Sequence, residues 1–220
     1  MKEQSITEQP ITEKPLTKEH NAEQSVAEQL RIMHDFAREK FIPIMDDESV
    51  EKFVEIVRQV RPKRILEIGS AVGYSAALMA MNSDAQIDTI EIEKSRLDIA
   101  KSLWAGLGLR GRINAFLGDA NTILRDVIAD FGYDFVFLDG AKSKYLEQLQ
   151  TCLPNVRSGG VIVADDVLFF GMVASGQPVA HKHRTTVTRL REFLEYISSN
   201  PLLDVTIDDS GNGMAIIKKK

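Results

Sequence analysis

The sequence predicts an α/β fold: a doubly wound, mostly parallel sheet of seven strands that ends in an antiparallel hairpin and follows two N-terminal helices. Two observations favour this fold. After Pro62, short β-rich runs alternate with amphipathic helical segments, as in sheets built from strand–helix–strand crossovers. Near the end of the chain, a turn over 208–212 separates two more β-rich runs, which indicates a hairpin.

The first 20 residues contain a decaying five-residue repeat, at 6–10 and again at 11–15, with two prolines and few apolar residues. Such a composition is typical of a flexible tail. We therefore expect a flexible N-terminal tail over 1–20 and one domain over 21–220. Within that domain, 21–62 form the N-terminal helices and 63–220 form the sheet-containing core.

Two helices are expected before the sheet. The first has apolar residues at helical spacing over 26–37 and ends before Pro43. The second begins at Asp46 or Asp47 and ends before Pro62.

The seven strands are expected at 64–68, 87–92, 113–117, 135–138, 161–164, 203–207 and 213–217. Between them lie amphipathic helices with apolar stripes. Trp104 and Cys152 fall on such stripes, so we expect both side chains in the core.

Composition excludes several classes of protein. The chain has 220 residues and a net charge of −5, which suits one acidic domain and argues weakly against a nucleic-acid partner. It has one cysteine, no secretion-signal pattern at its start and no apolar run long enough for a membrane span. We therefore expect a cytoplasmic protein without disulfides, a structural zinc site or a membrane association.

The first strand runs into a glycine turn with the pattern E-x-G-x-x-x-G, from Glu67 to Gly73. In doubly wound sheets the ligand binds at the carboxyl ends of the strands, where glycine allows a close approach of the backbone. Position 71 is Ala where a dinucleotide fingerprint needs Gly, so a pyrophosphate site fits poorly. The alternative interpretation is a plain tight turn.

Acidic residues lie at the ends of the next two strands, where Glu91 closes the second strand. Glu91 lies 22 residues after Gly69, close to the spacing at which a carboxylate accepts hydrogen bonds from ribose hydroxyls. Asp119 follows the third strand in the sequence G-D-A, where a carboxylate could bind an adenine amine.

This order of motifs resembles the class I S-adenosylmethionine-dependent methyltransferases, which have a Rossmann-like fold. The resemblance covers about 41–220 and implies S-adenosylmethionine as the cofactor. It implies that the cofactor is lined by Met45, Glu67, Gly69, Ser75, Glu91, Asp119, Ala120 and Asp139. A nicotinamide-dependent oxidoreductase is the alternative from another class.

Three carboxylates follow the fourth and fifth predicted strands: Asp139, Asp165 and Asp166. Adjacent parallel strands end at the same edge of a sheet, so these groups should converge beside the cofactor. Converging carboxylates repel each other unless a cation lies between them, and an all-oxygen set favours Mg²⁺ or Mn²⁺ over zinc. The alternative is that each Asp caps its own loop.

The same residues resemble the cation-dependent O-methyltransferases of the catechol and caffeoyl-coenzyme A branch, whose patterns are D-x-x-K and D-N. Asp139 and Lys142 match the first pattern, whereas Asp166 replaces the usual Asn and adds a negative charge. The resemblance implies that Asp139 and Lys142 are catalytic and that Lys142 is the general base. That role requires nearby positive charge to depress the pKa of Lys142.

The segment 167–191 contains no acidic residue and four basic ones, Lys182, Arg184, Arg189 and Arg191. Charge alone fits either a phosphate-binding surface or a solvated loop. The segment and the closing G-N-G-M-A-I-I-K resemble the bacterial tRNA 5-hydroxyuridine methyltransferases. This resemblance implies 5-methoxyuridine formation at the wobble position, the tRNA anticodon loop as partner, and a homodimer with contacts from Phe169, Phe170 and Met172. A small catechol-type substrate is the alternative.

Overall fold

The computed structural model describes residues 26–40, 42, 44–45, 47–126, 132–175 and 177–220. The predicted tail over 1–20 lies outside these residues. The helices are α1 (Val26–Glu39), α2 (Asp47–Val60), α3 (Tyr74–Met81), α4 (Lys94–Gly106), α5 (Ala120–Asp126), α6 (Tyr145–Cys152) and α7 (Arg184–Ser199). The strands are β1 (Arg64–Ile68), β2 (Gln86–Glu91), β3 (Ile113–Leu117), β4 (Tyr133–Leu138), β5 (Val156–Ala164), β6 (Leu203–Asp208) and β7 (Met214–Lys219).

The strands form one seven-stranded sheet in the order β3-β2-β1-β4-β5-β7-β6. The five strands from β3 to β5 are parallel, and β7 runs antiparallel to both of its neighbours. The prediction of a Rossmann-like, mostly parallel sheet with an antiparallel C-terminal hairpin is thus confirmed. The strand order reverses between β1 and β4, and in this class of sheet the ligand binds at such a reversal.

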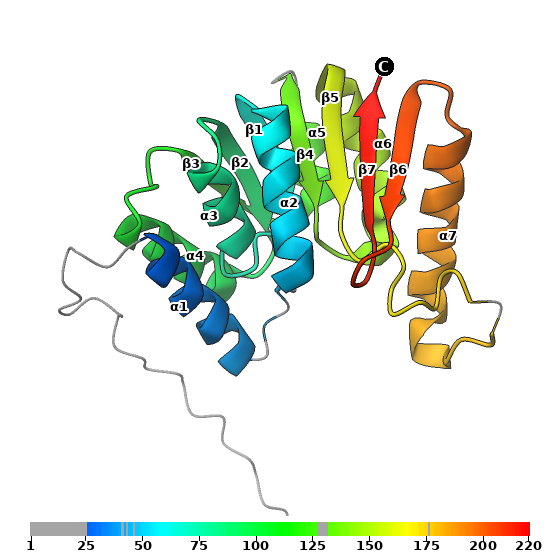
Figure 1. Ribbon diagram of the computed structural model, residues 1–220, viewed down its shortest axis with the longest axis horizontal. Coiled ribbons are helices and arrows are strands. Elements are labelled where there is room, and N and C mark those ends of the chain that lie inside the picture. Colours follow the sequence, from blue (N-terminus) through cyan, green and yellow to red (C-terminus); the bar gives the residue numbers. More distant parts are fainter. Residues whose placement is uncertain (1–25, 41, 43, 46, 127–131, 176) are drawn as a thin grey trace, which may run out of the picture.

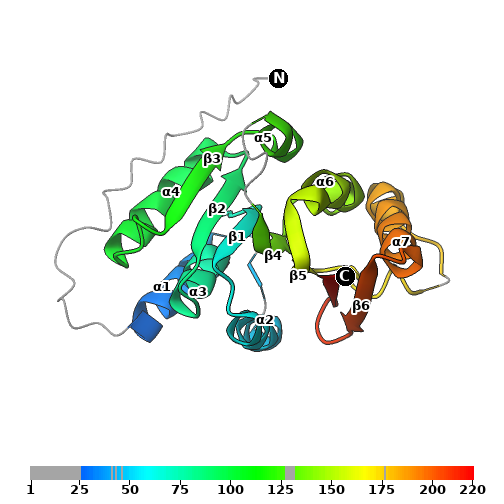
Figure 2. The same cartoon turned by 90° about the horizontal axis from the view of Figure 1, so that it is seen from above.

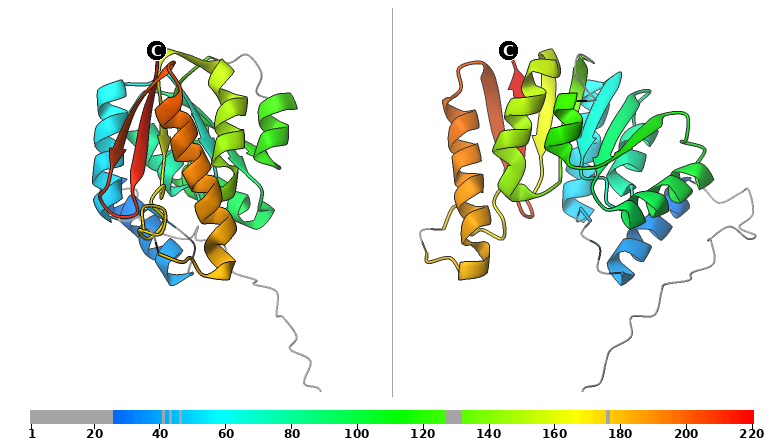
Figure 3. Two further views of the ribbon diagram at one scale, coloured as in Figure 1. Left: turned by 90° about the vertical axis from the view of Figure 1, so that its right-hand side faces the viewer. Right: turned by 180° about the vertical axis from the view of Figure 1, so that it is seen from behind.

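Helices cover both faces of the sheet. Buried side chains of α1, α2, α3 and α4 pack in one apolar cluster, and those of α5, α6 and α7 pack in the other. Figure 1 shows α2 and α3 in front of the sheet, and Figure 2 shows α5, α6 and α7 on the far side of it. The view from behind in Figure 3 shows the second layer directly. The sheet is therefore buried on both faces, which explains the apolar runs of its central strands.

Trp104 and Cys152 are buried, as predicted. Trp104 fixes α4 against the glycine turn because its indole N–H donates to the carbonyl of Gly73 at 2.8 Å. A donor that satisfies a buried carbonyl also lets the large apolar ring enter the core without an unpaired polar group.

The structure corrects several predicted boundaries. Strand β2 ends at Glu91, so Ile92 lies beyond it and is 66% exposed. Strands β4 and β5 begin earlier than predicted, because each extends past its apolar run into polar residues. Helix α5 was not predicted, since its seven residues are mostly polar and carry no clear apolar stripe.

None of the helices in the described part of the chain has the length and apolar character needed to cross a membrane.

Candidate functional site

The glycine turn after β1 is held in a tight, left-handed conformation. Gly69 and Gly73 have φ values of +97° and +86°, and Ala71 between them has a φ of +44°. Its backbone N–H groups bond to β2: that of Gly69 donates to the Ile90 carbonyl at 2.9 Å, and that of Ala71 to a Glu91 carboxylate oxygen at 2.8 Å. Glu91 therefore shapes the turn from the neighbouring strand.

Gly69 also allows β1 to approach the loop after β4. A Cβ atom at position 69 would lie 2.6 Å from the backbone oxygen of Asp139. We expect Gly69→Ala to lower the free energy of unfolding by about 3 kcal/mol, because it adds both backbone strain and a clash with backbone atoms. Chemical denaturation measures this change. Gly111→Ala is the matched control, since nothing lies within 4 Å of a Cβ there, and an equal loss in both variants would contradict the interpretation.

A small cavity lies between the glycine turn, the start of α3 and Asp139. It is lined by Ile44, Met45, Gly69, Ser70, Ala71, Val72, Tyr74, Ser75 and Asp139. Four of these were predicted to contact the cofactor: Met45, Gly69, Ser75 and Asp139. The other five were not predicted, although four of them lie within or directly after the glycine motif and could have been found from it: Ser70, Ala71, Val72 and Tyr74.

The other predicted cofactor residues do not line this cavity. Glu91 is buried, and its two carboxylate oxygens accept from the backbone N–H groups of Ala71 and Glu93. Asp119 is exposed and accepts from the N–H and hydroxyl of Thr122, so it caps α5, which begins at Ala120. Glu91, the last residue of β2, and Asp119, two residues after β3, nevertheless lie at the same edge of the sheet as the cavity.

Glu67 was predicted to line the cofactor, but its side chain is fully buried beneath the cavity. Its two carboxyl oxygens accept from the Ser75 and Thr89 hydroxyls, both at 2.5 Å. Burial raises the pKa of Glu67 to about 7, despite these two hydrogen bonds. The prediction of direct contact is corrected, and Glu67 supports the cavity from below.

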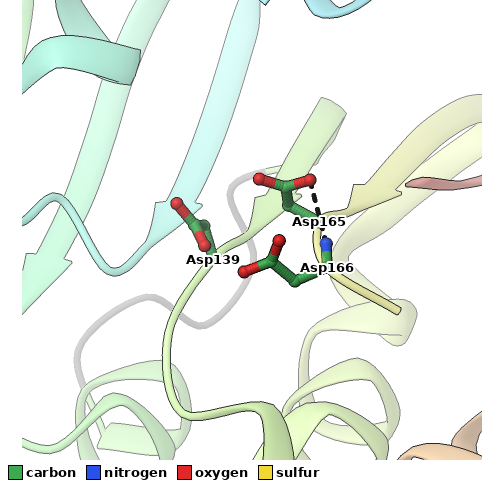
Figure 4. A group of neighbouring side chains, drawn as sticks. All are labelled: Asp139, Asp165 and Asp166. Atoms are coloured by element: carbon green, nitrogen blue, oxygen red, sulfur yellow. Dashed lines mark hydrogen bonds between the residues drawn. The ribbon is translucent and has the colours of Figure 1, made fainter. Parts of the chain in front are cut away.

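Asp139, Asp165 and Asp166 converge at the ends of β4 and β5, as Figure 4 shows. One carboxylate oxygen from each lies within 4.8 Å of the others. Asp166 has a φ of +56°, which turns the chain just after β5 and lets two consecutive side chains face the same space. Asp is among the few residues that tolerate this conformation. Tyr145 supports the turn by donating its hydroxyl to the Asp165 carbonyl at 3.0 Å, a role the sequence analysis missed.

The electrostatics of this carboxylate cluster fit a divalent cation. Burial, together with the charges of Asp139 and Asp166, raises the pKa of Asp165 to about 8. Burial and Asp166 also raise the pKa of Asp139. These carboxyl groups hold their negative charge at a cost, which a bound cation would offset, and oxygen ligands suit Mg²⁺ or Mn²⁺. The predicted ligands are therefore together and chemically suited to such an ion.

Lys142 lies within the same cluster. Its Nζ is 2.9 Å from Asp139 and 3.0 Å from Asp166. Burial works against the ammonium form, but attraction to Tyr145, Asp139 and Asp166 raises the pKa of Lys142 well above its ordinary value. The expectation that the pKa of Lys142 is depressed is thus wrong, because the neighbouring groups of the protein raise it.

The predicted basic segment is only partly available to a ligand. The Arg191 guanidinium donates to the carbonyls of Met172, Val173 and Ser175, so it fixes the loop before α7. Arg189 pairs with Glu192 at 2.7 Å on the exposed face of α7, and Arg184 donates to the Val179 carbonyl. Lys182 and Arg184 are exposed at the start of α7.

The aromatic pair Phe169 and Phe170 follows the carboxylate cluster. Both have positive φ values, and their ring centroids are 5.3 Å apart. Phe169 and Met172 pack partly against the core, whereas Phe170 is 69% exposed. Of the three residues expected at a dimer contact, Phe170 offers the most apolar surface.

The chain shares this architecture with known proteins. A family model described as "O-methyltransferase" matches residues 18–220. A caffeoyl-CoA O-methyltransferase from Stellaria longipes is 29% identical over 174 residues, which are 74% of this chain and 71% of the relative.

Solved structures of O-methyltransferases have a similar fold. A Staphylococcus aureus protein provisionally named a caffeoyl-CoA O-methyltransferase superposes with a TM-score of 0.81 at 26% identity, covering 87% of this chain and 92% of the other. An O-methyltransferase from Bacillus cereus, solved in complex with SAH, gives a TM-score of 0.78 at 24% identity, covering 87% and 90%.

Proposed function

The chain belongs to the O-methyltransferase family, and we propose that it transfers the methyl group of S-adenosylmethionine to a hydroxyl oxygen with the help of a divalent cation. The position of Asp139 carries this proposal. Asp139 lines the cavity beside the glycine turn, and its side chain belongs to the carboxylate cluster. A cofactor in the cavity and a cation in the cluster would therefore be neighbours. The nicotinamide oxidoreductase alternative has no support from the family.

Different residues would bind the cofactor, bind the cation and accept the proton. Gly69, Ser75 and Met45 would hold the cofactor, whose sulfonium supplies an activated methyl group. Asp139, Asp165 and Asp166 would hold the cation, which when bound polarises the acceptor hydroxyl and offsets the negative charge around Lys142. Lys142 accepts the hydroxyl proton at Nζ, and the rigid strand ends position the acceptor oxygen toward the methyl group.

For the acceptor, we propose a molecule with two neighbouring oxygens. A catechol-type small molecule is the first candidate, because the relatives named above include a caffeoyl-CoA O-methyltransferase. The wobble base 5-hydroxyuridine of tRNA is the second candidate, since its 5-hydroxyl and 4-carbonyl oxygens are also neighbours. The exposed basic side chains of Lys182 and Arg184 favour it, as phosphate contacts would need them. A cytoplasmic location and a homodimer through Phe170 stay proposals.

One assay with two acceptors tests this function. The purified protein is given S-adenosylmethionine and Mg²⁺ with either a caffeoyl ester or tRNA that carries 5-hydroxyuridine, and methylated products are measured by mass spectrometry. We expect methylation of a catechol hydroxyl and its loss in chelator, because the carboxylate cluster alone repels an anionic acceptor. Full activity in chelator would refute the role of the cation.

Charge reversal then separates the two acceptors. If tRNA is the substrate, Lys182→Glu with Arg184→Glu should lower its kcat/KM by about 10-fold to 100-fold, because two phosphate contacts become repulsive. Lys101→Glu, an exposed residue on α4, is the matched control. If tRNA turnover is unaffected by the combined Lys182→Glu and Arg184→Glu changes, the basic segment has no role in tRNA binding.

A further inference from the structure

Glu67 lies directly beneath Ser75, a residue that lines the cavity beside the glycine turn. The carboxyl group is 0% exposed, and one of its oxygens accepts from the Ser75 hydroxyl at 2.5 Å. Ser75 itself lines the cavity. Glu67 can therefore act on a ligand through Ser75 without touching the ligand.

We propose that Glu67 is a positioning residue that takes up a proton when the cofactor binds and thereby turns the Ser75 hydroxyl toward the cofactor. This inference rests on the proposed function, because it assumes that S-adenosylmethionine or its demethylated product occupies the cavity.

The two ends of the cofactor's amino-acid group have different partners available. Ser75 is the second residue of α3, and the N-terminus of a helix favours a negatively charged group. Asp139 lies on the wall of the same cavity and suits a positively charged group. The cofactor carboxylate therefore belongs at the start of α3 and its ammonium group near Asp139. A carboxylate only accepts hydrogen bonds, so Ser75 must donate to it.

The charge state of Glu67 decides whether Ser75 can donate. When Glu67 is ionised, it accepts from both Ser75 and Thr89, and the single proton of the Ser75 hydroxyl is committed to it. The Ser75 oxygen then offers only lone pairs to the cavity, which repel a carboxylate. When Glu67 carries a proton, it donates to the Ser75 oxygen, and the Ser75 proton is free to point at the cofactor.

The surroundings of Glu67 keep both charge states accessible near neutral pH. Burial raises its pKa to about 7, the hydroxyls of Ser75 and Thr89 oppose this rise, and the charges of Asp139 and Glu91 add to it. Below pH 7 the free protein already carries the proton. Above pH 7 the proton must be taken up on binding, so affinity for the cofactor falls about tenfold for each further pH unit.

Calorimetry of S-adenosylhomocysteine binding at pH 8, in two buffers with different ionisation enthalpies and saturating Mg²⁺, measures this proton uptake. We expect the wild-type protein to take up nearly one proton more than Glu67→Gln, whose side chain cannot titrate. The affinity of Glu67→Gln should also change far less between pH 6 and pH 8. Glu51→Gln, an exposed residue on α2, is the matched control and should behave like wild type.

Ser75→Ala provides a second test if Glu67→Gln does not fold. Without the hydroxyl, proton uptake should disappear even though Glu67 is intact, which a merely structural role for Glu67 does not predict. Equal proton uptake in wild type and in whichever variants fold would overturn the inference while leaving the proposed function intact. Failure of the wild-type protein to bind S-adenosylhomocysteine would instead overturn the proposed function and this inference with it.

Discussion

Asp165→Asn is expected to lower methyl transfer by about 1000-fold, because it removes a buried carboxylate from the proposed cation site and with it several kcal/mol of cation-dependent stabilisation. Asn keeps the shape of the side chain, so binding of S-adenosylhomocysteine should change little. Single-turnover assays measure the first effect and calorimetry the second. Activity close to wild type would remove Asp165 from the cation site.

The same substitution should stabilise the protein when no divalent cation is present. The pKa of Asp165 is raised from an ordinary 3.8 to about 8, so the folded state favours the protonated carboxyl group. The resulting destabilisation is absent below pH 3.8, grows as the pH rises, and is complete above about pH 8. At pH 8 in chelator, Asp165→Asn should therefore raise the free energy of unfolding by about 1 kcal/mol. Asp209→Asn in the exposed hairpin turn should have no such effect.

Loss of activity together with a gain in stability is the mark of a site whose charges are retained for function. If Asp165 acted only as a loop cap, Asp165→Asn should leave activity near wild type, because Asn keeps the Oδ1 that accepts from the Asp166 N–H. The two measurements on one variant therefore distinguish the cation site from the capping alternative.

Strand positions and the carboxylate cluster could be predicted from the sequence because both depend on local pattern. The bounds of β1 and β3 were predicted to the residue, because each β-rich run ends directly before a glycine, Gly69 or Gly118. Asp139, Asp165 and Asp166 could be placed together because parallel neighbours end at one edge. Helix α5 escaped prediction because tertiary packing of Leu124, and not a repeating pattern, holds it.

Side-chain roles were harder to predict, because they depend on partners far away in the sequence. Arg191 looked like a phosphate ligand until its three carbonyl partners in the loop at 172–175 were known. Glu67 looked like a cofactor contact, but its partner Thr89 on β2 places it below the surface. In the same way, the pKa of Lys142 depends on Asp166, which the sequence places 24 residues away.

Substitution of Lys142 is expected to have the second large effect on methyl transfer. Lys142→Met and Lys142→Arg should both lower kcat by about 1000-fold, because neither side chain can take the hydroxyl proton at physiological pH. Cofactor affinity should stay within about twofold of wild type, since Lys142 does not line the cavity. Lys144→Met is the matched control, because Lys144 is exposed and lies with Lys142 in one short 3-10 helix, Lys142–Lys144.

Arginine makes this test specific to proton transfer. The contacts of Lys142 with Asp139 and Asp166 favour a positive charge at this position, which Arg retains. If Lys142 acted only through its charge, Lys142→Arg would keep about a tenth of wild-type activity, whereas Lys142→Met would lose nearly all of it. Two equally inactive variants instead require a group that gives up and regains a proton. The raised pKa of Lys142 in the protein alone then implies that base function depends on the cation, so activity should rise with pH in Mg²⁺.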